Sequence, residues 1–140
     1  MKSLLTALVS TLILSASLPA AATKGAEPLQ ISRGETVNLA DYLVPGKTVI
    51  FDFTSKYCGP CQTYNEPLHN LHAKRADVVV VKVDINRPDK KGIDWQSPVA
   101  QQYRLEAIPH FKVYSPEGKL IAEDRAASRL VNEMISKLEN

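Results

Sequence analysis

Cysteine is scarce in this sequence: the 140 residues include two, Cys58 and Cys61. Small secreted domains usually carry several disulfide bonds as structural crosslinks, and two cysteines this close in sequence cannot provide such a framework. A bridge between them would close so short a loop that it would restrict the unfolded chain very little. The pair is therefore expected to have a chemical role instead of a structural one.

An excess of charge of either sign is also absent. The chain has 17 Lys and Arg residues against 15 Asp and Glu residues, with the two signs interspersed. Nucleic-acid recognition needs clustered Lys and Arg, so no nucleic-acid partner is expected, and proteins are the more suitable partners. The length and the 44% content of hydrophobic residues suit one globular domain.

The chain lacks an apolar run long enough to span a membrane without interruption, which takes about 20 residues. Its apolar run, Leu4–Leu14, follows Lys2 and precedes the small residues of Pro19–Ala22. This pattern predicts a signal peptide at residues 1–22 and export to an oxidising compartment, of which the bacterial periplasm is the favoured one. A membrane-anchoring helix at the same residues is the alternative.

Residues 23–46 are predicted to form a lead-in segment. A short edge strand is expected at Leu29–Ile31, followed by a helical turn over residues 39–44. Asn38 is suited to cap that turn, and Pro45-Gly46 is suited to end it.

Strand and helix patterns alternate from residue 47 onward. The β-branched and aromatic run Thr48–Phe53 predicts a buried strand, and Val78–Asp84 predicts a central parallel strand covered on both faces. Between them a helix is expected over residues 60–75, with a kink at Pro67. The inward stripe of this helix is predicted to consist of Tyr64, Leu68, Leu71 and Ala76.

A polar loop at residues 86–96 follows the second strand. Ser97 predicts the start of a short helix over residues 99–103, and residues 110–123 have the pattern of a β-hairpin. Ser128 is predicted to cap a last amphipathic helix. The element order is therefore β-α-β, α, β-β-α.

A Cys-X-X-Cys pair at the start of a helix can carry out disulfide exchange. Cys58 would stand at the helix N-terminus, where free N–H groups and the helix dipole stabilise a thiolate, and it is expected to be exposed. Cys61 would lie one turn further in, shielded but close enough to resolve a mixed disulfide. Cys58 is therefore the expected attacking residue and Cys61 the expected resolving residue.

Four motifs resemble the thioredoxin family in their order and context: Phe51-Asp52-Phe53, Cys58-Gly59-Pro60-Cys61, Lys82 and Ile108-Pro109. The resemblance covers roughly residues 47–138. It implies an α/β thioredoxin fold over residues 47–140, in which a βαβ unit, a connecting helix and a ββα unit form a mixed central sheet flanked by helices. It also implies a thiol–disulfide oxidoreductase whose redox group is the Cys58–Cys61 disulfide, without a metal or an organic cofactor.

The resemblance assigns roles to further residues. Asp52 would be a buried carboxylate behind Cys61 that helps to move its proton, and Lys82 would be its buried charge partner. The alternative is that Asp52 and Lys82 end on solvated faces of the sheet. Ile108-Pro109 would form a cis peptide bond beside the cysteines and expose the Ile108 backbone for pairing with a substrate chain.

Substrate contacts are also expected from residues around the cysteines. Tyr57 stands where the family usually has Trp, and Gly59 and Pro60 lie between the two cysteines. The loop at residues 86–96 is longer than in thioredoxin and carries Trp95, which is predicted to contact the substrate. Anchoring this loop in the core is the alternative role of Trp95. The helix-kinking proline lies one residue later than in the family.

Three histidines have weaker functional signals. His110 follows Ile108-Pro109 and could tune the charge of Cys58, or it could be an ordinary hydrogen-bonded strand residue. His69 and His72 have a spacing that can bind metal, but no acidic or cysteine ligand stands beside them, so a solvated helix face is expected.

Together these features predict a secreted oxidoreductase that exchanges its dithiol with protein thiols and disulfides as a reductant. A reductant in an oxidising compartment needs an electron source, so a membrane dithiol carrier is expected as a partner of a monomeric protein. A disulfide oxidase or isomerase with the same residues is the first alternative. The others are a Cu(I)-handling protein, with the metal held by Cys58 and Cys61, and a redox-inert binding module.

Overall fold

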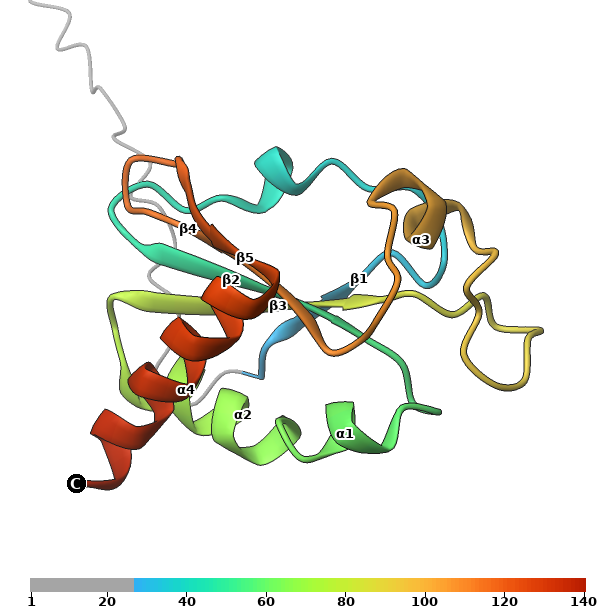
Figure 1. Ribbon diagram of the computed structural model, residues 1–140. Helices are drawn as coiled ribbons and strands as arrows, with labels where there is room; N and C mark the ends of the chain where they lie inside the picture. The colour runs from blue at the N-terminus through green and yellow to red at the C-terminus, as the bar shows by residue number, and fades with distance from the viewer. Residues whose placement is uncertain (1–26) are drawn as a thin grey trace, which may run out of the picture.

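The computed structural model describes residues 27–140. The signal peptide predicted at residues 1–22, with its anchor alternative, lies outside the described residues. Five strands form one sheet in the order β1-β3-β2-β4-β5. Their bounds are β1 Leu29–Ile31, β2 Thr48–Thr54, β3 Val78–Asp84, β4 His110–Tyr114 and β5 Leu120–Glu123. β1 and β2 pair with β3 in parallel, and β4 runs antiparallel to β2 and β5, which confirms the mixed sheet of the thioredoxin fold (Figure 1).

Helices cover both faces of the sheet. One face carries α1 (Gly59–Gln62), α2 (Asn65–Lys74) and α4 (Asp124–Glu139), and the other carries the 3-10 helix η1 (Leu39–Tyr42) and α3 (Pro98–Gln102) (Figure 1). Within residues 27–140, no helix is both long enough and apolar enough to cross a membrane.

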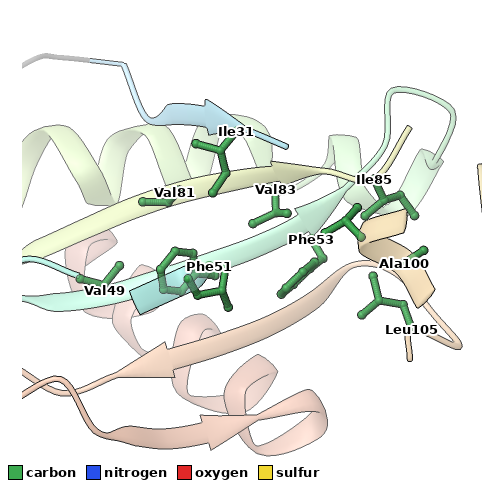
Figure 2. Close-up of a cluster of buried hydrophobic side chains, with 11 residues drawn as sticks. Ile31, Val49, Phe51, Phe53, Val81, Val83, Ile85, Ala100 and Leu105 are labelled. Carbon is green, nitrogen blue, oxygen red and sulfur yellow. The ribbon is translucent and has the colours of Figure 1, made fainter. Parts of the chain in front are cut away.

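Side chains of β2 and β3 alternate between two hydrophobic clusters. Phe51 and Phe53 on β2 lie with Val81 and Val83 on β3 in the cluster covered by η1 and α3 (Figure 2). The intervening residues point to the cluster beneath α2 and α4, which contains Ile50, Leu68, Leu71, Val78, Val80, Phe111, Val113, Ala127 and Val131. Burial on both faces explains why both strands are almost continuously apolar in sequence.

The helix predicted over residues 60–75 is divided into two. α1 ends at Gln62 and α2 begins at Asn65, so the break lies before Pro67 and not at it. Proline has no N–H to donate to the Thr63 carbonyl four residues earlier, and its ring clashes with that carbonyl, so the chain breaks at the preceding turn. In the first turn of α2 the same proline is tolerated.

Other boundaries differ from the predictions by a few residues. The prediction that Ser128 caps the last helix is wrong, because α4 begins at Asp124 and the Ser128 hydroxyl donates to the Asp124 carbonyl inside the helix. Ala76 lies beyond α2 and is exposed, so it does not belong to the inward stripe. The predicted caps Asn38 and Ser97 are confirmed, since their side chains accept N–H groups of η1 and α3, respectively.

The lead-in segment is tied to the end of β3 and to α3, and it closely approaches Arg87 in the loop between them. The Gly34 N–H donates to the Asp84 carbonyl over 2.9 Å, and the Gly34 carbonyl accepts the Val99 N–H over 3.1 Å. Gly34 has a φ of +87°, and a Cβ atom there would lie 2.6 Å from the backbone nitrogen of Arg87. Glycine at this position therefore permits both a left-handed backbone and a close approach of two chain segments.

We expect Gly34→Ala to destabilise the protein more than Gly46→Ala does. Gly46 has a similar φ of +80° but open space around its Cβ position, so it isolates the conformational cost of alanine, about 1–2 kcal/mol. Gly34→Ala adds the clash with Arg87 and should lose at least about 1 kcal/mol more. Urea unfolding of both variants measures the difference. Equal losses would show that the two segments can separate without cost.

Candidate active site

The two cysteines lie where β2 passes into α1. Cys58 is the N-cap of α1, Cys61 is buried within it, and Pro60 stands in its first turn. A disulfide bond joins the cysteines, with their Cα atoms 5.3 Å apart. The backbone N–H of Cys61 donates to Cys58 Sγ over 3.1 Å. The start of the helix therefore directs a donor at the sulfur that was expected to attack.

The expectation that Cys58 is exposed is wrong for the oxidised protein. Cys58 is 3% exposed and Cys61 is fully buried, so Cys58 is only slightly the more accessible of the two. The carbonyl oxygen of Ile108 lies 3.6 Å from Cys58 Sγ and contributes to its cover. The Ile108–Pro109 peptide bond is cis. This segment therefore lies directly against the attacking sulfur.

The other predicted substrate contacts near the cysteines are on the surface. Tyr57 is 39% exposed, and Gly59 and Pro60 are also exposed. The Lys56 ammonium lies 5.1 Å from the centre of the Tyr57 ring. These side chains form an accessible rim around the nearly closed disulfide.

Ser55 organises the backbone of the cysteine loop, and sequence reasoning missed it. Its carbonyl accepts the Cys58 N–H over 3.0 Å, and its hydroxyl oxygen accepts the Tyr57 N–H over 3.2 Å. Gln62, also missed, donates its side-chain amide to the carbonyls of Ser55 and Cys58. The loop before the attacking cysteine is therefore held from both of its ends.

Asn86 connects the long 86–96 loop to the cysteine loop. The Ser55 hydroxyl donates to Asn86 Oδ1 over 2.6 Å, and the Asn86 side-chain amide donates to the Gly92 carbonyl. Asp94 donates its N–H to the same Asn86 oxygen and pairs with Arg87. One signal could have found Ser55 and Asn86: each follows one of two neighbouring parallel strands, and the carboxyl ends of such strands meet at one edge of the sheet.

Trp95 and His110 have structural neighbours. Trp95 is half-buried and packs against the hydrophobic cluster of Phe51 and Phe53, which fits the core-anchor role, and its substrate contact stays a prediction. His110 pairs with Phe53 across β4 and β2, its ring centre 5.7 Å from the Phe53 ring centre. It therefore points to the same face as Phe53, opposite the face of Asp52.

Asp52 is completely buried beneath α2, on the same face as Ile50. Among the described residues, neither of its carboxylate oxygens has a hydrogen-bond partner. Burial raises the pKa of Asp52 from 3.8 to about 7, and the positive charge of Lys82 opposes that rise. A carboxyl group with this pKa can accept and release a proton near neutral pH.

Lys82 does not form the predicted ion pair with Asp52. The two residues are directly opposite on β2 and β3, but the half-buried Lys82 donates its ammonium to Asn65 Oδ1 on α2. The ammonium obtains a neutral hydrogen-bond partner there without the desolvation that a fully buried ion pair requires. The charge of Lys82 therefore acts on Asp52 without a direct contact.

His69 and His72 have separate partners. His69 Nδ1 lies 3.0 Å from a carboxylate oxygen of Glu27, while His72 Nδ1 accepts the Val80 N–H over 3.0 Å. Burial is the main cause that lowers the pKa of His72. Between residues 27 and 140, no group of three or more His, Cys, Asp or Glu side chains is gathered to hold a metal ion.

The stability of the protein should fall as the pH rises from about 4 to 7. The folded-state pKa of Asp52 lies above its unfolded value, so in this window the native protein binds the extra proton, and its stabilising effect is lost on deprotonation. Asp52→Asn keeps the shape of the neutral carboxyl and should remove this pH dependence. Above pH 7 the variant should be more stable by on the order of 4 kcal/mol.

Urea unfolding of the oxidised protein at pH 5 and pH 8 tests this expectation. Asp77→Asn is the control. Asp77 is exposed and its hydrogen bond to Arg75 lowers its pKa, so it is ionised at both pH values; its loss should lower the stability slightly and leave the difference between pH 5 and pH 8 unchanged. An unchanged pH dependence in Asp52→Asn would contradict the assignment of a raised pKa.

Comparison with known proteins gives a consistent result. A thioredoxin family model matches residues 35–140. Thioredoxin H2-2 of Oryza sativa subsp. japonica is 30% identical over 95 residues, which cover 68% of this chain and 60% of the rice protein. Thioredoxin H5 of Arabidopsis thaliana is 32% identical over 92 residues, which cover 66% of this chain and 69% of that protein.

The reduced thioredoxin pre-protein of Schistosoma mansoni, a solved structure, has 26% identity and a TM-score of 0.56, with 80% of this chain and 98% of that chain covered. The chain therefore belongs to the thioredoxin family, whose members are thiol–disulfide oxidoreductases.

Proposed function

We propose that this protein reduces disulfide bonds of protein substrates in an oxidising compartment outside the cytoplasm. The Cys58 thiolate attacks a substrate disulfide, which forms a mixed disulfide and releases one substrate thiolate. Cys61 then gives its proton to Asp52 and attacks Cys58 Sγ, which releases the second substrate sulfur. Two electrons pass to the substrate, and the Cys58–Cys61 disulfide remains.

The arrangement around Cys58 Sγ carries this proposal. The sulfur accepts the N–H of Cys61 at the start of α1, which stabilises a thiolate, and it lies against the Ile108 carbonyl. The Ile108 backbone is suited to pair with an extended substrate chain, and the exposed Tyr57 rim surrounds the point of attack.

One feature supports the reducing direction: the Gly59-Pro60 dipeptide resembles that of the reducing members of the family. A reduction potential near that of thioredoxin, about −270 mV, would agree with a reductant. A value near −120 mV would instead identify an oxidase.

The location and the electron donor are further parts of the proposal. The pattern of residues 1–22 supports export, and a reductant outside the cytoplasm needs a supply of electrons, for which a membrane-embedded dithiol carrier is suited. The N-terminal residue of the protein recovered from its cells distinguishes a cleaved signal peptide from a retained anchor. Any Cu(I) site would consist of the two cysteines alone, because within residues 27–140 no group of three or more His, Cys, Asp or Glu side chains is gathered to hold a metal ion.

The two cysteine variants should differ in a specific way. Cys58→Ser removes the attacking sulfur and should abolish the catalysed reduction of insulin by dithiothreitol. Cys61→Ser should also lose turnover but should accumulate a mixed disulfide with the substrate, because the resolving sulfur is missing. Both variants lose the same disulfide, so each is a control for the structural effect of that loss in the other. Trapping of substrate by Cys58→Ser but not by Cys61→Ser would reverse the assigned roles.

A further inference from the structure

Lys82 is connected to the cysteine loop by a chain of side-chain hydrogen bonds. Its ammonium donates to Asn65 Oδ1, and the Asn65 amide donates to Gln62 Oε1 over 2.9 Å. The Gln62 amide in turn donates to the carbonyl of Ser55 over 2.9 Å and more weakly to that of Cys58. Asn65 is therefore the link between the charge near Asp52 and the loop that carries the attacking cysteine.

The break between α1 and α2 places Asn65 at this point. α2 begins with Asn65, two residues before Pro67, so the asparagine stands in the first turn of the helix above β3. Lys82, Asn65 and Gln62 line a pocket of about 230 Å³, where Lys82 is half-buried, while Asp52 is fully buried within the sheet. The Lys82 side chain thus has two destinations: the amide in the pocket or the carboxyl on the neighbouring strand.

We propose that Asn65 is a positioning residue that holds the Lys82 ammonium in the pocket and so prevents it from pairing with the Asp52 carboxyl. The catalytic meaning of this assignment rests on the proposed function. When Cys61 attacks Cys58, its thiol proton must pass to the Asp52 carboxylate, and a carboxylate paired with an ammonium is a poorer proton acceptor. Asn65 therefore keeps Asp52 able to accept that proton near neutral pH.

The charged surroundings of Asp52 make Lys82 the group to test. Across the sheet, β4 places Phe111 opposite Asp52, and α4 contributes apolar side chains to this face. Titratable groups on the elements around this face include Tyr64, His69 and His72 at α2, Lys82 and Asp84 on β3, and Lys56 in the cysteine loop. Cys61 on α1 does not titrate in the oxidised protein, because it is disulfide-bonded. Of these, Lys82 is the group whose charge acts on the pKa of Asp52.

Removal of the Asn65 amide should let Lys82 approach Asp52. In Asn65→Leu, we expect the midpoint of the Asp52 titration to fall by at least about one pH unit, because an opposite charge within about 4–6 Å favours the carboxylate. The measurement is NMR detection of the Asp52 carboxyl carbon in the oxidised protein. Asn65→Asp keeps an acceptor for Lys82 and should not lower the midpoint. Asn70→Leu, at a half-buried asparagine of the same helix, should leave it unchanged.

A second background separates positioning from general disturbance of α2. In Lys82→Met, which has no ammonium, Asn65→Leu should no longer move the Asp52 midpoint. An unchanged midpoint in Asn65→Leu alone, or an equal fall in both backgrounds, would overturn the assignment. In the insulin assay, the rise of the reduction rate with pH on the acid side of its profile should move to lower pH together with the Asp52 midpoint. The titration needs no turnover, so it can fail or succeed independently of the cysteine assay that tests the proposed function.

Discussion

Burial of β2 on both faces is the constraint on which the structure depends. A strand in this position must be apolar, and Phe51 and Phe53 serve one layer while Ile50 serves the other. The same burial isolates the single carboxyl group of the strand from water and raises its pKa. It also provides a rigid base from which the chain leaves the sheet and presents Cys58 at the start of α1. The strand thus supports both the core and the acid–base group of the site.

The site consists of two linked halves. Behind the disulfide, Asp52 supplies a proton acceptor whose electrostatic partner, Lys82, is directed elsewhere by Asn65. In front of it, the Ile108 carbonyl and the exposed Tyr57 rim define where a substrate chain would lie. Gln62 contacts both halves, because it receives a hydrogen bond from Asn65 and holds the carbonyls of Ser55 and Cys58. Proton transfer and sulfur position are therefore coupled through ordinary hydrogen bonds.

Local patterns predicted most of the elements and the two cysteines. β3 could be predicted to the residue because a continuous run of valines between polar segments has few other interpretations. The helix breaks before Pro67 and not at Pro67 as predicted, because a proline disrupts the turn that precedes it. The choice of Lys82 between Asn65 and Asp52 could not be predicted, since both partners lie distant in sequence and the outcome depends on relative desolvation. The same holds for the contact of Ser55 with Asn86.

The bond between Ser55 and Asn86 has a consequence for how this protein could diverge or be re-engineered. The 86–96 loop is joined to the cysteine loop through the hydrogen bond between Asn86 and Ser55. It also contacts the segment after β1, because its Arg87 lies close against Gly34 of that segment. It is therefore not a module that can be exchanged by itself with the corresponding loop of another family member. A transplant would have to carry Gly34, Ser55 and Asn86 together, so these three positions are expected to vary as one unit.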